Sequence, residues 1–280
     1  MTKVIYVHLN YNKFSFSKDL VEYNHVYGEL PEYAIHSINQ SKKLFDDVII
    51  LTDEDNKDDI ESFYKMCSIT YPHFSKNSFW FFTLARLFCV FNYVVKNKIE
   101  KFIHLEYDNL IYYNDNCLNN LPNGVYFTQV GPKIGSAGFL YSNSLIATNN
   151  FLLSLIKLIQ MGEDFLANEI KSVHLYEMEM IDFLNINKFC QYLPLFPDDN
   201  YFDICKKVFD GASYGQYLGG TNNGDPAGWF GTHHHVGNKL QKNEIEITFH
   251  DKPYLKQNNE IFEIFNLHLH NKKAIKEFLL

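Results

Sequence analysis

Two carboxylates separated by one residue, Glu106 and Asp108, are the side chains in this sequence best placed to do chemistry. They follow a short apolar run, 102–105, that has the composition of a buried strand. In an extended segment, side chains two residues apart leave on the same face and lie close together. Two like charges held that close repel unless a cation or an arginine lies between them. The alternative interpretation is a pair of solvated acids at a strand end.

A second set of possible ligands lies near the carboxyl end of the chain. His268 and His270 alternate with leucines, so in an extended run both imidazoles lie on one face. Mg²⁺ and Mn²⁺ bind carboxylate oxygens, and Mn²⁺ often takes an imidazole as well. Asp108 with these histidines therefore predicts a divalent metal site, with Lys272 as a phosphate contact; the alternative is a pair of surface histidines on an edge strand. The three consecutive histidines 233–235 point in different directions on any regular backbone and are not expected to bind metal.

Several other charged side chains have two interpretations each. Arg86, on a predicted helix, either ends a salt bridge on the helix face or reaches the phosphates of a ligand bound beside the acidic pair. Glu177, Glu179 and Asp182 form a solvated helix face, or one of them is the partner of an acceptor hydroxyl. Asp210, in a glycine-rich stretch, has the same two interpretations.

These side chains need a framework, and the order of elements predicts an α/β fold. An apolar strand over 4–9 is followed by a helix that begins near Pro31 and by a second apolar strand over 48–51. This alternation is typical of a mostly parallel sheet with helices on both faces. Further strands are expected over 102–105, 124–130, 136–141, 245–249 and 260–269, further helices over 79–96, 151–159, 173–187 and 274–279, and irregular segments over 53–59 and 209–231.

Polar side chains follow the first two predicted strands. His8 and Asn10 end the first strand, and Thr52 and Asp53 end the second. Open α/β sheets bind their ligands at the carboxyl ends of the strands. We therefore expect these four residues to lie at a ligand-binding edge, together with the acidic pair.

Composition and charge exclude several classes of protein. The formal net charge of −8 argues against a nucleic-acid-binding surface, which needs clustered Lys and Arg. The five cysteines show no C-x-x-C pair and are expected to be reduced thiols of a cytoplasmic protein. No signal peptide is expected, and the apolar stretch 79–95 contains Arg86 and Asn92, so no membrane span is expected.

The sequence motifs of P-loop NTPases, dinucleotide-binding enzymes and α/β-hydrolases do not occur, which argues against these three classes of enzyme.

The chain resembles the nucleotide-sugar-dependent glycosyltransferases of the GT-A fold. The resemblance rests on the mid-chain Glu106-Tyr107-Asp108, on the Arg-bearing helix before it, and on the terminal NLHLHNK; FDGA at 209 and GQYLGG at 215 also look like segments of bacterial and large-virus glycosyltransferase-like proteins. In that superfamily an Asp-x-Asp motif binds a divalent metal on the diphosphate of the donor. Here Glu replaces the first Asp.

The resemblance implies a single GT-A-like domain of 280 residues and a role for each candidate residue. Residues 1–130 would bind a UDP- or GDP-sugar, and 131–280 would bind a glycan or another hydroxyl acceptor through an irregular C-terminal region. Mn²⁺ or Mg²⁺ would be bound by Asp108 with His268 or His270. The remaining roles would be contacts to the donor (His8, Asn10, Thr52, Asp53, Arg86, Glu106, Lys272) and catalysis at the acceptor (Glu179, Asp182, Asp210).

The predicted activity is therefore that of a metal-dependent, hexosyltransferase-like glycosyltransferase, either inverting or retaining. Two alternatives remain open. The chain could be a catalytically inactive protein that binds carbohydrate or nucleotide, because the first Asp of the metal motif is missing. It could also be a metal-dependent nucleotidyltransferase or hydrolase built on a similar sheet.

Overall fold

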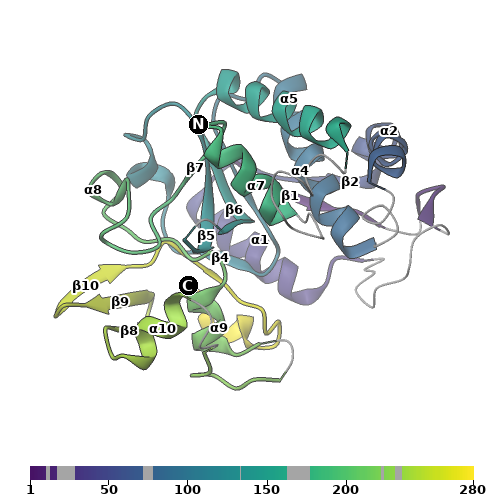
Figure 1. Cartoon of the computed structure of the whole chain (residues 1–280). Helices are drawn as coiled ribbons and strands as arrows, with labels where there is room; N and C mark the ends of the chain where they lie inside the picture. The colour runs from purple at the N-terminus through teal and green to yellow at the C-terminus, as the bar shows by residue number, and fades with distance from the viewer. Residues whose placement is uncertain are drawn as a thin grey trace.

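A computed structural model describes residues 1–10, 13–17, 29–71, 78–132, 134–162, 177–221, 224–230 and 235–280. Its centre is a six-stranded sheet with the strand order β2-β1-β3-β6-β5-β7 (Figure 1). Neighbouring strands are parallel except at β6, which runs antiparallel to both β3 and β5. The predicted α/β class with a mostly parallel sheet is confirmed. The strands are β1 (Lys3–His8), β2 (Val48–Thr52), β3 (Phe102–Leu105), β5 (Val125–Gly131), β6 (Ile134–Ser142) and β7 (Gln191–Tyr192).

Helices cover both faces of this sheet. Alternate side chains of each strand point to opposite faces, and because both sets are apolar here, each face must be buried. In β1, Ile5 and Val7 belong to one apolar cluster and Val4 and Tyr6 to another. The first cluster contains side chains of four helices, and the second contains Ile38 of a fifth helix on the opposite face. The four helices are α2 (Asp53–Thr70), α4 (Ser78–Lys96), α5 (Leu145–Met161) and α7 (Glu177–Ile186), and the fifth is α1 (Glu32–Leu44).

The C-terminal part of the chain forms two smaller sheets around an apolar cluster of its own. One is the three-stranded sheet β10-β9-β8, at the lower left of Figure 1. The other pairs β11 with β4 directly after β3, so that residue 268 lies opposite residue 109. These elements are β4 (Asn109–Ile111), η3 (Asp115–Leu118), α8 (Phe202–Cys205), α9 (Ser213–Gly219), α10 (His235–Gln241), β8 (Ile245–Phe249), β9 (Pro253–Gln257), β10 (Glu260–Glu263), β11 (Asn266–His268) and η4 (Ala274–Phe278).

Three of the predicted segments differ from the structure. Residues 53–59 are not a loop but the first turns of α2, where Thr52 and Asp55 form a capping box and acids are favoured by the helix dipole. The glycine-rich segment 209–231 contains the short helix α9. The strand expected over 260–269 is two strands, β10 and β11, in different sheets, and β9 was not predicted. Of the helix expected over 173–187, residues 173–176 lie outside the described residues.

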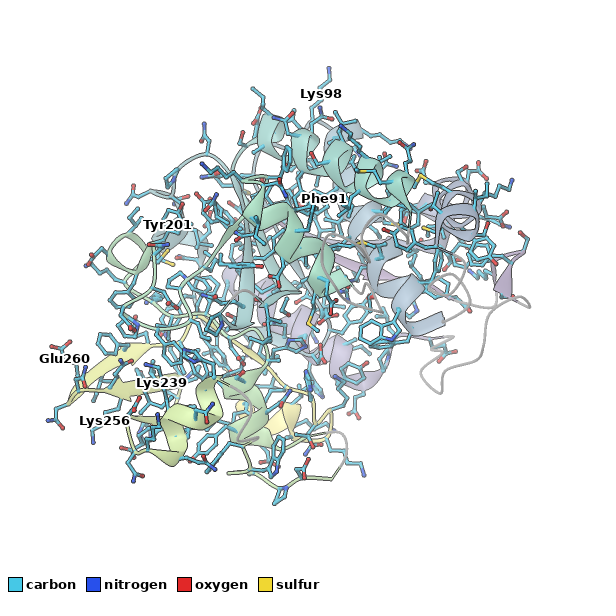
Figure 2. The ribbon with its side chains drawn as sticks, viewed as in Figure 1. Phe91, Lys98, Tyr201, Lys239, Lys256 and Glu260 are labelled. Atoms are coloured by element: carbon cyan, nitrogen blue, oxygen red, sulfur yellow. The ribbon has the colours of Figure 1, made fainter. Side chains whose placement is uncertain are left out.

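Helix α4 is a long and largely apolar helix. By length and composition alone, its stretch Phe79–Lys96 could cross a membrane. In this fold Leu84, Leu87 and Phe91 are fully buried against the sheet and α5. Figure 2 shows Phe91 inside the molecule, whereas Lys98 and Glu260 lie at its periphery. The helix is therefore a core element here and carries Arg86 to the edge of the sheet.

Candidate functional site

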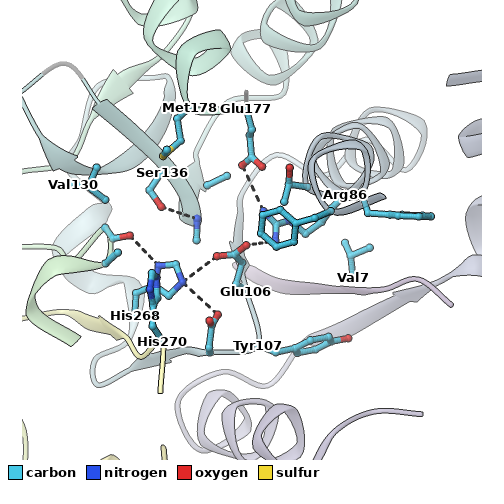
Figure 3. A pocket seen from close by; sticks show the side chains of 18 of the residues that line it. Val7, Arg86, Glu106, Tyr107, Val130, Ser136, Glu177, Met178, His268 and His270 are labelled. Atoms are coloured by element: carbon cyan, nitrogen blue, oxygen red, sulfur yellow. Dashed lines mark hydrogen bonds and ion pairs between the residues drawn. The ribbon is translucent and has the colours of Figure 1, made fainter. Parts of the chain in front are cut away.

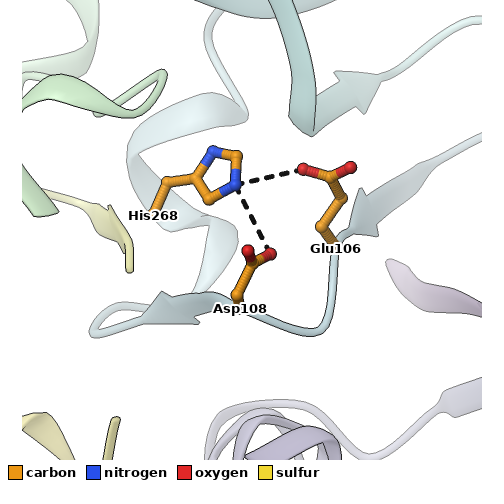
Figure 4. Close-up of side chains that lie close together, drawn as sticks. All are labelled: Glu106, Asp108 and His268. Atoms are coloured by element: carbon orange, nitrogen blue, oxygen red, sulfur yellow. Dashed lines mark ion pairs between the residues drawn. The ribbon is translucent and has the colours of Figure 1, made fainter. Parts of the chain in front are cut away.

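Glu106 and Asp108 lie in a tight turn between β3 and β4. The N–H of Asn109 donates to the carbonyl of Glu106 (N···O 3.1 Å), so the segment turns where an extended strand was expected. The predicted closeness of the two carboxylates holds nevertheless. Ligand atoms of Glu106, Asp108 and His268 all lie within 4.8 Å of one another, and we call these three residues the triad (Figure 4).

The ring of His268 is held in one orientation. Its Nδ1 lies 2.9 Å from the carbonyl oxygen of Gly211. A carbonyl only accepts, so Nδ1 carries the proton and Nε2 faces the carboxylates. Nε2 lies 3.1 Å from Oε2 of Glu106 and 3.4 Å from Oδ1 of Asp108. His268 is therefore the histidine that joins the acidic pair.

His270 has a different position. Its ring packs edge-on against His268, with 4.9 Å between the centroids, and its Nδ1 lies 2.9 Å from the amide nitrogen of Gln216. It lines the same cavity but is not a member of the triad. The pairing of β11 with β4 thus places His268, and not His270, beside the acidic pair, and the role of either histidine as a metal ligand stays a prediction.

Basic side chains flank the triad on both sides. Arg86 forms an ion pair with Glu106, and Lys272 forms one with Asp108. Arg86 also approaches Oε1 of Glu177 at 3.5 Å. Figure 3 shows Glu106 between Arg86 and His268. Both interpretations of Arg86 from the sequence are thus compatible with its position, because it makes a salt bridge and also lines the cavity.

These contacts set the protonation states of the triad. Burial alone would raise the pKa of Glu106, but Arg86 and His268 outweigh it and hold that pKa well below its usual range. In the same way, Lys272 and His268 outweigh burial and lower the pKa of Asp108. Burial would lower the pKa of His268, yet Asp108 and Glu106 raise it well above its usual range. Two ionised carboxylates thus converge on one Nε2 position.

The donor set fits a divalent cation. Two carboxylate oxygens and one imidazole nitrogen are ligands that Mn²⁺ accepts, and carboxylates also suit Mg²⁺. The hydrogen bond from Nδ1 of His268 to Gly211 is the outer contact that orients a metal-binding histidine. Glu106, Asp108 and His268 would hold such an ion in place of the proton on Nε2.

The triad forms part of the wall of a cavity of about 580 Å³, within the range of sites for small molecules. Its polar side carries the triad, Arg86, Lys272 and Glu177. Small residues at 136–138 and 211–213 leave room beside the triad. The lining also includes aromatic side chains, Tyr33 from α1 and Phe79, Trp80 and Phe82 from the first turns of α4. We call this space the triad cavity.

The aromatic side was missed from the sequence, although a signal existed. Phe79, Phe82, Thr83 and Arg86 include pairs at spacings of three residues (79–82, 83–86) and four residues (79–83, 82–86), which places them on one face of a helix. All four line the triad cavity. From the sequence, only Arg86 of this face was considered as a ligand contact, so the aromatic residues that continue the face toward the start of the helix were not identified.

Asp210 has a structural role next to the site, through hydrogen bonds to the backbone. It is fully buried, and its carboxylate accepts backbone N–H groups of Ala212, Tyr214, Gly215 and His268 at 2.8–2.9 Å. These bonds fasten the start of α9 to β11. The prediction that Asp210 acts on an acceptor is not supported, because its oxygens are occupied by the backbone and it does not line the triad cavity.

Glu179 and Asp182, the other predicted acceptor-side residues, also lie outside the described lining of the cavity. Asp182 accepts a hydrogen bond from the hydroxyl of Tyr192 and one from the N–H of Gly135. Of the three acids predicted on this helix, Glu177 is the one that lines the triad cavity. It is buried beside Arg86, and burial raises its pKa to about 7, although Arg86 acts in the opposite direction.

Of the polar residues predicted at the ends of β1 and β2, some line the triad cavity and others do not. His8 lines the triad cavity, and its ring lies 6.1 Å from that of Tyr107. Thr52 and Asp53 begin α2, and neither lines the described part of the cavity. Asp53 binds Nζ of Lys13 at 2.9 Å and the N–H of Asn10 at 3.4 Å. The cluster of Asn10 and Asp53 therefore supports the loop after β1, and its contact with a ligand stays a prediction.

No protein-family model matches the chain, and no curated protein matches it. Among solved structures, the chain is similar to mouse xyloside xylosyltransferase 1 in its apo form, at 12% identity and a TM-score of 0.41, over 73% of this chain and 92% of that one. It is also similar to WbbM, a bifunctional glycosyltransferase, at 12% identity and a TM-score of 0.37, over 69% of this chain and 39% of that one. Each of these two proteins is described as a glycosyltransferase. Likenesses this distant do not carry an activity from one protein to another, so the functional proposal depends on the residues of the site.

Proposed function

We propose that this protein is a metal-dependent glycosyltransferase that transfers a sugar from a UDP- or GDP-sugar to a glycan or another hydroxyl acceptor. The observation that carries the proposal is the convergence of Glu106, Asp108 and the oriented Nε2 of His268 in the wall of a cavity. This donor set suits Mn²⁺ or Mg²⁺, and such an ion bridges readily to a diphosphate.

The basic residues of the site support a diphosphate ligand. Arg86 and Lys272 flank the triad, and both line the cavity with nitrogen atoms that now contact carboxylates. When bound, the metal would stabilise negative charge on the departing nucleoside diphosphate. The side chains of Arg86 and Lys272 would then also contact the phosphate oxygens of the nucleoside diphosphate, where positive charge favours departure of the leaving group.

The rest of the cavity supports a nucleotide on one side and a sugar on the other. Its aromatic wall, which includes Phe79 and Trp80, offers flat apolar surface to a base or ribose. His8 would add a polar contact at the end of β1. The space beside Ser136 and Gly138 would hold the donor sugar, with Glu177 within reach of hydroxyl groups. Glu177, buried and with a pKa near 7, also has the properties of a group that exchanges a proton with an acceptor.

Thermal stabilisation by nucleoside diphosphates tests the proposal. A ligand that binds only the folded state raises the melting temperature, so UDP or GDP should do so in the presence of Mn²⁺ and much less in its absence. The variant Asp108→Asn should lose the Mn²⁺-dependent part. No stabilisation by any nucleoside diphosphate, with or without the metal, would refute the proposal.

A second candidate is an inactive protein that binds a nucleotide or carbohydrate at the same place. One observation favours it: both carboxylates of the triad are already paired, Glu106 with Arg86 and Asp108 with Lys272. Slow hydrolysis of a nucleotide-sugar that disappears in Asp108→Ala would exclude this candidate. Analysis of the products would also exclude a hydrolase or nucleotidyltransferase, which cleaves within the phosphate chain and leaves the anomeric carbon attached to phosphate.

A further inference from the structure

The triad cavity is joined to a second large cavity over the surface of α9 and α10. Ser213 and Gln216, which line the triad cavity, also line a small depression of about 10 Å³ together with Trp229 and Phe230. Phe230 and Leu240 in turn line a cavity of about 710 Å³ between α10 and the β8-β9-β10 sheet. We call the surface from Ser213 through Trp229 to this cavity the α9–α10 groove.

Aromatic side chains line the groove: Trp229 and Phe230 in the small depression, and Tyr217 with Phe230 in the large cavity. The rings of Tyr217 and Phe230 lie 6.4 Å apart. Trp229 is half-buried, and its indole N–H has no hydrogen-bond partner among the described residues. Aromatic rings bury apolar surface at little entropic cost, and a tryptophan at a ligand site usually finds a partner for its N–H. The exposed face of Trp229 is thus suited to a ligand that is partly apolar and partly hydrogen-bonding.

Beyond the aromatic residues, the groove is polar but carries little net charge. Amide side chains from the end of α10, from the turn after it and from the β9–β10 turn line the large cavity: Gln241, Asn243, Asn258 and Asn259. Amides both donate and accept, which matches the hydroxyl groups of a sugar. The charged residues there nearly cancel, since Lys256 lies 3.3 Å from Glu246 and only Glu244 is left over. Such a surface, on a protein with a net charge of −8, does not suit a polyanion.

From this combination we propose that the α9–α10 groove binds a neutral oligosaccharide, the acceptor chain, with one end in the triad cavity. Trp229 would stack against the C–H face of one sugar ring, and the amides of the large cavity would bind hydroxyl groups of rings further along. The proposal rests on the proposed glycosyltransferase function, and it names the acceptor class: a chain of several neutral sugars. The length of the groove predicts that affinity rises with the length of the chain.

The two tryptophans of the protein make the experiment specific. Trp80 lines the triad cavity and Trp229 lines the groove, so each of the variants Trp80→Phe and Trp229→Phe keeps one fluorescent reporter. Trp80→Phe is titrated with malto-, cello- and manno-oligosaccharides of increasing length. The emission of Trp229 should change, with a Kd that falls as the chain lengthens in the series that fits. Trp229→Phe is titrated with UDP and GDP in the presence of Mn²⁺. The only tryptophan left in this variant is Trp80, so its change in emission reports ligand binding in the triad cavity independently of the groove.

Two variants separate contact from folding. Trp229→Ala should weaken binding of the longest oligosaccharide by about tenfold or more, measured by calorimetry. Asn243→Ala changes an exposed residue and should weaken only the longer chains. Phe189→Ala removes a partly exposed ring that lines none of these cavities and should leave binding unchanged. The proposal is overturned if no series changes the emission of Trp229, if Kd does not depend on length, or if an acidic oligosaccharide of equal length binds more tightly than the neutral ones.

Discussion

Gly138 lies against the triad, and its replacement by alanine should disable the metal site. A Cβ at this position would lie 2.6 Å from Nδ1 and 2.7 Å from Cε1 of His268, and 3.0 Å from Oε2 of Glu106. Contacts this short force a shift, and the ring of His268 cannot move without breaking its bond to the carbonyl of Gly211. The variant Gly138→Ala therefore separates the atoms that would bind the ion.

The expected magnitudes follow from two opposing effects. Overpacking a well-packed site costs about 1–3 kcal/mol, whereas replacing glycine within a strand returns about 0.5–1 kcal/mol. The net loss of stability should thus be modest, about 0–2.5 kcal/mol, which lowers the melting temperature by at most several degrees. Loss of the orientation of a metal-binding histidine typically weakens metal binding by ~10–100-fold. The effect on the metal should therefore be much larger than the effect on the fold.

Calorimetric titration with Mn²⁺, together with thermal denaturation, measures both effects on the same sample. Gly131→Ala is the matched control, because its Cβ would meet its nearest neighbour, Cβ of His235, at an ordinary 3.5 Å. The control should bind Mn²⁺ as the unchanged protein does. If Gly138→Ala binds Mn²⁺ as tightly as the control, the assignment of the ion to the triad is refuted.

Three further predictions concern neighbouring residues. His268→Ala should weaken Mn²⁺ binding by about 100-fold or more, and His270→Ala by only a few-fold, in the same titration; equal losses would contradict the assignment. Asp210→Ala should lower the free energy of unfolding by more than about 2 kcal/mol in urea, because four N–H groups lose their acceptor; unchanged stability would refute its structural role. The pKa of Glu177 is raised from 4.5 to about 7, so the folded state binds the proton more tightly and stability falls as pH rises across that interval, by up to ~1.4 kcal/mol per pH unit. Urea unfolding at a series of pH values should show this slope disappear in Glu177→Gln, and a slope that persists would contradict the burial of its neutral form.

The acidic pair could be predicted because its signals are local. An apolar run ending in two acids indicates a strand and its carboxyl end, and one intervening residue keeps the two side chains close in a turn as well as in a strand. The choice of His268 over His270 was not accessible from sequence. It depends on the register of β11 against β4, which joins residues 155 to 159 positions apart along the chain.

Asp210 shows the limit of predicting function from residue type. An acid in a glycine-rich stretch has the composition of a catalytic loop, and nothing local reveals that four backbone N–H groups point at it. Those bonds exist only because Gly215 allows the backbone of α9 to approach β11, where a Cβ would lie 2.2 Å from the carbonyl oxygen of His268. By contrast, the helix at 53–59 was predictable, since Thr52 and Asp55 have the spacing of a capping box.

The most direct test of the account is a crystal structure of the protein with MnCl₂ and UDP, with the ion located by its anomalous scattering. The account predicts one Mn²⁺ bound by Glu106, Asp108 and Nε2 of His268, in contact with the diphosphate, with Arg86 and Lys272 turned toward phosphate oxygens. A diphosphate bound in the cavity with no ion at the triad, or an ion bound elsewhere, would contradict it.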